Sequence, residues 1–256
     1  MKLDHVTSRD NPALVRLRKL GAEATAYRKT GSLWVEGDHL IRAALQRGWQ
    51  PALVVLTEAA MQSPALAALA ETAPRALVVP EALFKGLSGL ESPAQIGAEL
   101  TLPADPAIDG RAATVVLDRL QDAGNVGAIL RSAAALGFRQ VLALKGTAAL
   151  WSPKVVRAGQ GAHFGLRLVE GLTIDGLDGL TVPLVATSSH DSQPLPAVRL
   201  PWPCAWVMGH EGQGVSPALM ARCALRVGIP QPGGEESLNV AAAAAICLYE
   251  SARQRG

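Results

Sequence analysis

Three short segments of this chain carry side chains that can act on a ligand, and each follows an apolar run. They are DRLQDAGNVGAILRSAAALGF at 118–138, VMGHEGQGV at 207–215 and IPQPGGEESLNVAAAAAICLYE at 229–250. Their candidate functional side chains are Asn125 and Arg131 in the first segment, Glu211 in the second, and Ser237 and Asn239 in the third. These groups supply one permanent positive charge, one carboxylate and small hydrogen-bonding groups, a set suited to binding and orienting a ligand.

In the first segment an apolar run ends at Asp118, and we expect a helix to begin near residues 124–125. Apolar residues at helical spacing form one stripe, namely Val126, Ile129, Ala133 and Leu136. At about 100° per residue, Arg131 falls on the far side of the helix from this stripe. From position alone Arg131 can equally be an ordinary solvated arginine, and Asn125 an ordinary N-cap.

The second segment places three glycines and Glu211 directly after an apolar run. Glycine lets a ligand approach the backbone closely, but the spacing is Gly-x-x-Gly-x-Gly, not the dinucleotide pattern Gly-x-Gly-x-x-Gly. The glycines of 159–165 are also mis-spaced, and no Gly-x-x-x-x-Gly-Lys-Ser/Thr motif occurs, which argues against a standard Rossmann or P-loop phosphate site. Glu211 is expected to be buried, which is unusual in a purely structural turn. A hairpin-like turn stays open as the alternative.

In the third segment Ser237 is a credible N-cap for an alanine-rich helix, and Asn239 is a poor helix former in its first turn. One face of this helix carries mostly small side chains, at Val240, Ala244, Cys247, Leu248 and Ser251. Small side chains let another backbone pack closely, so this face belongs either to the core or to a subunit interface. Glu235 and Glu236 are better explained by favouring the helix N-terminus than by chemistry.

The elements that must position these residues alternate along the chain. Up to residue 100 we expect strands at 52–56 and 76–79, with helices from Pro12 and near 38–47, 64–71 and 81–86. Residues 101–111, with little periodicity, predict a linker. Further on, strands are expected at 113–118, 140–144, 183–187, 204–208 and 224–229, and helices near 125–136, 153–159, 216–222 and 237–254. This alternation predicts an α/β fold with a parallel sheet, whose ligands bind where the strands end.

Composition and charge narrow the class of protein. The 256 residues are 49% hydrophobic with a formal net charge of +2. Residues 1–50 hold nine Lys or Arg against five Asp or Glu, compatible with a polyanionic partner or with a solvated surface. Three cysteines without Cys-x-x-Cys spacing predict reduced thiols in a cytoplasmic protein, and no metal site is expected. The N-terminus lacks a signal-peptide core, and the longest apolar run, 240–248, is too short for a membrane span.

Taken together, the three segments resemble the motifs of the SpoU (TrmH-like) family in the SPOUT superfamily, which are S-adenosylmethionine-dependent RNA ribose 2′-O-methyltransferases. NVGAILRSAAALGF resembles the first family motif, VMGHEGQGV the second and IPQPGGEESLNVAAAAA the third, in the family's order. The stretches NPALVRLRKL, YRKTGSLWVEGDHLI and SPAQIGAEL resemble the L30e-like substrate-binding domain that many members carry. His210 and RAGQGAHF at 157–164 depart from the commoner family residues, which concerns substrate tuning more than activity.

The resemblance implies an L30e-like α/β domain for RNA binding at 1–100, a linker at 101–111, and a SpoU α/β domain with a deep trefoil knot at 112–256. It also implies a homodimer with each active site at the subunit interface, and the small-residue C-terminal helix is then expected to be part of that interface. The cofactor would be S-adenosylmethionine. The residues expected to contact the cofactor are Thr187, Gly209, Gly214, Ile229 and Leu238.

The resemblance further implies roles in methyl transfer. The family's proposed base or activator matches Arg131. Because arginine normally stays protonated, a more conservative role is to bind the adjacent RNA phosphate and lower the effective pKa of the ribose hydroxyl. Asn125, Ser237 and Asn239 would orient the nucleotide and the loops, and Glu211 would hold the active-site loop or contact the nucleotide. The expected phosphate ligands are Arg9, Arg16, Arg18, Lys19 and Arg28 in the first domain, with Lys154 and Arg157 near the site.

Ribosomal (23S) RNA is the leading substrate, since members with this extra domain often modify large-subunit RNA. Methylation of tRNA is an alternative. A non-catalytic knotted RNA-binding protein is another, and the presence of Arg131, Asn239 and the second-motif glycines argues against it. A nucleotide-dependent metabolic enzyme is disfavoured by the missing phosphate-loop spacings.

Overall fold

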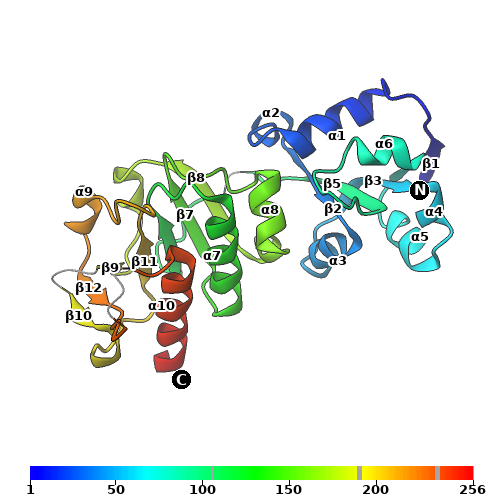
Figure 1. Cartoon of the computed structure of the whole chain (residues 1–256). Helices are drawn as coiled ribbons and strands as arrows, with labels where there is room; N and C mark the ends of the chain where they lie inside the picture. Colours follow the sequence, from blue (N-terminus) through cyan, green and yellow to red (C-terminus); the bar gives the residue numbers. More distant parts are fainter. Residues whose placement is uncertain (105, 189–191, 234–236, 256) are drawn as a thin grey trace. The chain divides into compact units, whose positions relative to one another are not determined.

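The computed structural model describes residues 1–104, 106–188, 192–233 and 237–255. Glu235 and Glu236, whose role the sequence leaves open, lie outside these described residues. The chain divides into two compact units, and each is best considered by itself (Figure 1). Unit 1 comprises residues 1–104 and 151–164, and unit 2 comprises residues 105–150 and 165–256.

Unit 1 is built around a five-stranded mixed sheet with strand order β1-β4-β3-β5-β2. β1, β4 and β3 run parallel, whereas β5 is antiparallel to both of its neighbours, β3 and β2. The strands are β1 (Lys2–His5), β2 (Ser32–Glu36), β3 (Pro51–Thr57), β4 (Arg75–Val79) and β5 (Ile96–Thr101). The sequence predicts β3 and β4 to within one residue but misses the other three. Charged residues interrupt β1 and β5, so their apolar pattern is weak.

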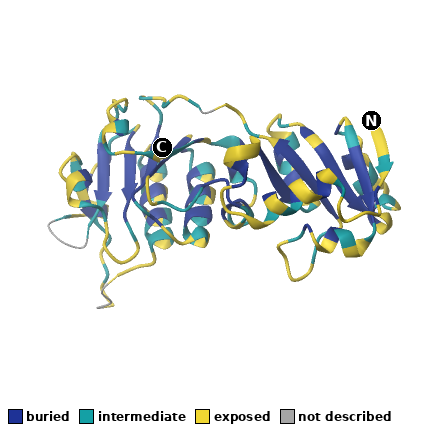
Figure 2. Cartoon of the chain, turned by 90° about the horizontal axis from the view of Figure 1, so that it is seen from above, coloured by how far each residue is buried: buried dark blue, intermediate teal, exposed yellow. Residues whose placement is uncertain are grey.

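Six helices of unit 1 precede residue 104, and α1 shows how they pack. Asn11 caps α1 by accepting a hydrogen bond from the Ala13 N–H at 3.0 Å. Leu14, Leu17 and Leu20 are buried on one face of α1. Figure 2 shows most of this sheet as buried, with the edge strand β1 largely exposed, and the outer faces of the helices as exposed. The helices are α1 (Pro12–Ala22), α2 (Tyr27–Thr30), α3 (Asp38–Gln46), α4 (Glu58–Met61), α5 (Pro64–Ala70) and α6 (Glu81–Lys85).

Unit 1 also includes a segment from the later part of the sequence, residues 151–164. This segment forms α8 (Pro153–Gly159) and leads into η1 (Ala162–Gly165). Trp49 of unit 1 binds the segment, because its Nε1 donates a hydrogen bond to the Phe164 carbonyl at 3.2 Å and its ring lies 5.7 Å from that of Trp151. The sequence does not anticipate this packing, since it groups α8 with the strands of the second domain.

Unit 2 is built around a seven-stranded sheet with order β10-β12-β9-β11-β6-β7-β8, in which every adjacent pair is parallel. The expected parallel sheet is therefore confirmed, and the trefoil knot stays a prediction. The sequence misses only the short β10 and the edge strand β8. The strands are β6 (Thr114–Leu117), β7 (Gln140–Leu144), β8 (Arg167–Leu172), β9 (Leu184–Thr187), β10 (Gln193–Pro194), β11 (Ala205–Met208) and β12 (Leu225–Gly228).

Helices α7 (Ala123–Ala135) and α10 (Val240–Arg255) pack side by side in unit 2 (Figure 1). The small-residue face of α10 belongs to the core, because Ala244, Cys247, Leu248 and Ser251 are all buried. Ser251 also accepts a hydrogen bond from Nε1 of the fully buried Trp206 at 2.8 Å. This face therefore packs in the core of unit 2, whereas the resemblance implies that the helix belongs to a subunit interface. The remaining short elements are α9 (Pro217–Met220), η2 (Asp175–Leu177) and η3 (Leu195–Ala197).

None of the helices in the described part of the chain is long and apolar enough to cross a membrane.

Candidate active site

A cleft of about 1020 Å³ opens in unit 2 where β9, β11 and β12 end. These strands are parallel neighbours, so the loops that follow them meet at one edge of the sheet. The cleft is lined by all five residues that the sequence assigns to the cofactor, together with Glu211 and Ser237. The five are Thr187, Gly209, Gly214, Ile229 and Leu238. The predicted position of a binding site at the carboxyl edge of the sheet therefore coincides with a real cavity.

The loop after β11, residues 209–216, folds tightly back on itself. His210 and Gly214 exchange two backbone hydrogen bonds, at 3.0 and 2.8 Å. A side chain at Gly209 would overlap the Gly214 backbone, so glycine is required there. The Gly212 N–H donates to Nδ1 of His210 at 3.0 Å, so a neutral His210 carries its proton on Nε2. We call residues 209–216 the glycine loop.

Glu211, Asn125 and Asn239 join the three segments in one hydrogen-bond network. The Asn125 amide donates to Glu211 Oε1 at 3.4 Å, and the Asn239 amide donates to Asn125 Oδ1 at 3.0 Å. Glu211 also accepts hydrogen bonds from the backbone N–H groups of Gln121 at 3.3 Å and Asp122 at 3.1 Å. The network brings together three of the five side chains to which the sequence gives a role in chemistry.

The surroundings of Glu211 differ from the sequence expectation, because the residue is exposed rather than buried. Partial burial tends to raise the pKa of Glu211. Hydrogen bonds from its own backbone N–H, those of Asp122 and Gln121, and the Asn125 amide outweigh this effect, so the pKa is lowered overall. Glu211 is therefore an ionised carboxylate that attaches the glycine loop to the start of α7.

The structure corrects both predicted helix caps. Helix α10 begins at Val240, and Asn239 rather than Ser237 caps it, accepting from the N–H groups of Ala241 at 2.9 Å and Ala242 at 3.2 Å. Helix α7 is capped by Asp122, which accepts from the Asn125 N–H at 2.7 Å. Asn125 is thus inside the helix, and its side chain remains available for the network. Sequence boundaries of helices commonly err by a few residues, which is enough to misassign a cap.

Arg131 lies away from this network. Its side chain is exposed on α7, opposite the buried stripe, as the sequence predicts. It follows Asn125 by six residues, and residues share a helix face only when they are three, four or seven apart. Within one chain Arg131 and Asn125 therefore point in different directions.

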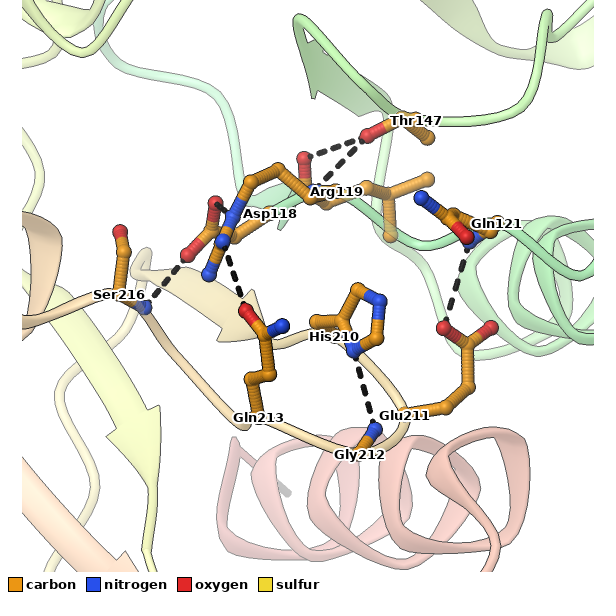
Figure 3. A network of polar contacts seen from close by, with 10 residues as sticks. Asp118, Arg119, Gln121, Thr147, His210, Glu211, Gly212, Gln213 and Ser216 are labelled. Atoms are coloured by element: carbon orange, nitrogen blue, oxygen red, sulfur yellow. Dashed lines mark hydrogen bonds and ion pairs between the residues drawn. The ribbon is translucent and has the colours of Figure 1, made fainter.

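A second polar network behind the glycine loop was not predicted (Figure 3). Asp118, at the end of β6, is 1% exposed and accepts hydrogen bonds from the Ser216 N–H at 2.6 Å and from Arg119 Nε at 3.0 Å. Arg119 reaches on to Gln213 Oε1 at 3.1 Å. The only sequence signal was a carboxylate directly after an apolar strand, which is too common to identify a role.

The motif segments are matched as a unit by one protein family. Residues 112–249 match the SpoU rRNA Methylase family, which is more than half of the chain. This chain belongs to the SpoU rRNA methylase family. Residues 11–98 match an MRM3-like substrate binding domain. The second match covers the greater part of unit 1.

Several RNA methyltransferases resemble this chain over most of its length. The chain is 32% identical to the 23S rRNA (guanosine(2553)-2′-O)-methyltransferase RlmP of Bacillus subtilis (strain 168), over 86% of this chain and 88% of that protein. Two solved structures with AdoMet resemble it, each with a TM-score of 0.86. One is the SpoU methyltransferase AviRb from Streptomyces viridochromogenes, 27% identical over 96% of this chain and 98% of that one. The other is an rRNA methyltransferase from Sinorhizobium meliloti, 28% identical over 98% of both chains.

The residues of the cleft fit S-adenosylmethionine, the cofactor of the family. Four of the lining residues are glycines, at positions 209, 212, 214 and 228, and glycine can offer only backbone to the cleft. Backbone N–H and C=O groups can bind the polar edges of an adenine and an amino acid. Leu238 is exposed at the cleft and Ile229 half-buried, and both offer apolar surface to a ring.

The residues predicted to bind RNA are mostly exposed, but several already make contacts within unit 1; Arg18, for example, donates to the Arg9 carbonyl at 3.0 Å. Arg16 makes two hydrogen bonds with the buried Glu99, at 3.0 and 2.7 Å. Its guanidinium therefore already pairs with a carboxylate inside the fold, and a phosphate-binding role for Arg16 stays a prediction. Helix α8 puts Lys154 and Arg157 in unit 1, and the Arg157 guanidinium packs against Gly89. The remaining predicted ligands in unit 1 are Arg9, Arg18, Lys19 and Arg28, of which only Arg18 is less than fully exposed.

Proposed function

We propose that this chain transfers a methyl group from S-adenosylmethionine to a ribose 2′-hydroxyl of ribosomal RNA, with large-subunit RNA as the substrate. The observation that carries the proposal is the Glu211–Asn125–Asn239 network, to which each of the three family motifs contributes one residue beside the cleft. The names of the full-length relatives, which are 23S rRNA 2′-O-methyltransferases, support the choice of RNA.

When bound, S-adenosylmethionine supplies a methyl group on a sulfonium, a donor that needs no metal. The chain must then hold the ribose in line with that methyl and favour loss of the hydroxyl proton. We assign the first task to Asn125, Asn239 and Ser237, whose amide and hydroxyl groups are at or beside the cleft. Glu211 holds the glycine loop in this scheme, since its oxygens already accept three hydrogen bonds from the start of α7.

Arg131 is assigned the second task, through charge rather than proton transfer. A guanidinium stays protonated in proteins, so it cannot serve as a base at neutral pH. Bound to the RNA phosphate beside the target, it would stabilise the developing negative charge on the 2′-oxygen. Its position off the Asn125 face of α7 is compatible with acting on the site of a second subunit.

We also propose that the chain forms a homodimer, with exposed apolar residues of α10 in the interface. Ile246 and Tyr249 are 40% and 59% exposed on α10, and their spacing of three residues puts them on one helix face. Large apolar side chains grouped on a surface are typical of interfaces. Light scattering should give twice the chain mass of 26.7 kDa at micromolar concentration. A monomer at that concentration would contradict the proposal.

Unit 1 is proposed to bind the RNA, with residues 1–100 as the substrate-binding domain, 101–111 as the linker and 112–256 as the catalytic sequence. The match to a substrate binding domain over 11–98 supports this division. We also place the enzyme in the cytoplasm, supported by three free cysteines, two of them buried.

The test is transfer of a tritiated methyl group from S-adenosylmethionine to separated RNA fractions from a strain that lacks the gene. Label should enter large-subunit ribosomal RNA at a 2′-O position. Label confined to tRNA would contradict the assigned substrate, and no acceptor in any fraction would contradict the activity.

The role of Arg131 is tested with Arg131→Ala in the same assay. Removing a charge that stabilises the reacting oxygen should lower kcat about 100-fold. Arg139→Ala is the matched control, because Arg139 is an exposed arginine just beyond the same helix, and it should keep normal turnover. Near-normal transfer by Arg131→Ala would remove Arg131 from the mechanism.

A further inference from the structure

Asp118 and Arg119 connect the end of β6 to the glycine loop at two points. The carboxylate of Asp118 binds the Ser216 N–H at the end of the loop, and the guanidinium of Arg119 binds Gln213 in its middle. The two residues also bind each other, with Arg119 Nε 3.0 Å from Asp118 Oδ1. Figure 3 shows both side chains pointing from the strand end toward the loop.

The backbone at Arg119 is strained for a residue that carries a side chain. Its φ is +62°, in the left-handed region that favours glycine. The Thr147 hydroxyl fixes this conformation by accepting from the Arg119 N–H at 3.1 Å, and in turn donates to the Leu117 carbonyl. Glycine would satisfy the same backbone without strain, so the unfavourable conformation is offset by something the side chain does.

The glycine loop needs such a support from outside. Three of its residues are glycine, and glycine loses more conformational freedom on ordering than any other residue. Gly212, Gln213 and Gly214 are all exposed, so burial does little to hold them. A loop that is disordered part of the time weakens binding in proportion to the fraction of time it is competent. Contacts that fix the loop in advance therefore raise affinity without touching the ligand.

We propose that Asp118 and Arg119 are positioning residues that hold the glycine loop in its binding conformation before S-adenosylmethionine enters. The proposal rests on the proposed function for the identity of the ligand, but the ordering of the loop is a property of the free protein. Arg119 acts through Gln213, and Asp118 acts through the Ser216 backbone. The Arg119 side chain is 35% exposed, so its loss removes buried contacts as well as the ion pair with Asp118.

The deciding variant is Arg119→Gly, which removes the side-chain contact and also relieves the backbone strain. Relief of the backbone strain partly offsets the loss of the ion pair with the buried Asp118, so we expect a melting temperature at or below that of the wild type. Amide hydrogen exchange of residues 212–216 in the cofactor-free protein should be faster. The Kd for S-adenosylmethionine, measured by calorimetry, should rise about 5- to 20-fold, while kcat at saturating cofactor stays within twofold.

Two further variants separate this role from general stability. Gln213→Ala should raise the Kd to a similar extent. The double variant with Arg119→Gly should bind S-adenosylmethionine no more weakly than either single variant, because both changes remove the same Arg119–Gln213 contact. Gln160→Gly is the matched control. Gln160 is the other non-glycine residue with positive φ in the described chain, at +48°; it belongs to unit 1 and is not among the residues that line the cleft. It should relieve strain with no change in Kd or in loop exchange.

Unchanged exchange of residues 212–216 in Arg119→Gly would overturn the positioning role, whatever ligand the cleft binds. An additive effect of Arg119→Gly and Gln213→Ala would overturn it as well. A wild-type protein that binds no S-adenosylmethionine would instead overturn the proposed function, and the exchange measurement would still decide the role of Arg119.

Discussion

Each unit contains a buried carboxylate that accepts hydrogen bonds from an arginine and from one other donor. In unit 1, Glu99 is 6% exposed and accepts from Arg16 and from the Ser32 hydroxyl, the latter at 2.8 Å. In unit 2, Asp118 is 1% exposed and accepts from Arg119 and from the Ser216 N–H. The chemistry is the same, since a buried charge must be paired and hydrogen-bonded. What differs is the kind of structure that supplies the partners.

The partners of Glu99 come from regular elements, and those of Asp118 do not. Arg16 lies on α1 and Ser32 on β2, so this cluster ties a helix and two strands of the first sheet together. Arg119 is the next residue in the chain, in a strained conformation, and Ser216 ends a glycine-rich loop. One buried charge thus stabilises a fold, whereas the other fixes a segment that would otherwise move. Buried ion pairs are weak evidence for stability as such, and the difference between partners indicates what each pair is for.

Among the variants that test this difference, Arg16→Ala is expected to cause the largest loss of stability. The variant leaves Glu99 buried with only the Ser32 hydroxyl, so the free energy of unfolding should fall by roughly 2–3 kcal/mol. That is below the cost at a fully buried pair, because the Arg16 side chain is 43% exposed. Urea denaturation measures the loss. The Kd for S-adenosylmethionine should not change, the reverse of Arg119→Gly.

Arg42→Ala provides the control for Arg16→Ala. Arg42 pairs with Asp38 at 3.4 Å on the same helix, and both side chains are about half exposed. Such a pair contributes about 0.3–0.5 kcal/mol. A similar small loss for Arg16→Ala would mean that the Glu99 cluster does not stabilise unit 1. If Arg16→Ala instead stays stable and loses RNA affinity, Arg16 is a phosphate ligand as the sequence predicts.

The sequence predicts some residues of these polar networks and misses others. Glu211 and Asn239 were identified because motifs of local spacing carry them, and both belong to the observed network. Asp118 and Arg119 were missed because their partners lie more than 90 residues away, and no local pattern records such a contact. Glu99 was missed as a strand residue for a related reason. A charge inside an apolar run argues against a buried strand until its partner is known.

Helix α8 shows that the sequence predicts a helix more readily than the domain in which that helix packs. Its amphipathic pattern and its Ser152 cap are local, so its existence and ends follow from the sequence. Its packing partner does not, because an apolar face specifies only that something covers it. Trp49 and the first sheet supply that cover. Deleting residues 1–100 would therefore expose apolar side chains of 151–164, so whole-chain variants are the better test of RNA binding.

A second matched pair is formed by two asparagine caps. Asn11 caps α1 in unit 1, and Asn239 caps α10 in unit 2. Each side-chain oxygen accepts from backbone N–H groups of the first turn at about the same distance, 3.0 and 2.9 Å. Only Asn239 has a further role, since its amide donates to Asn125 in the active-site network. Comparing the two asparagines therefore separates the effect of helix capping on stability from the effect of the Asn239 amide on activity.

A smaller loss of stability than that of Arg16→Ala is expected from replacing these caps. Asn11→Ala and Asn239→Ala should each lower the free energy of unfolding by about 1 kcal/mol, the usual cost of a lost N-cap. Methyl transfer should fall about tenfold or more only for Asn239→Ala, because that change also frees Asn125. Asn239→Ser sharpens the test. Serine can still cap α10 but has no amide to donate, so stability should return while transfer stays low. Full recovery of transfer in Asn239→Ser would show that Asn239 acts only as a cap, and the two units would then use the residue in the same way.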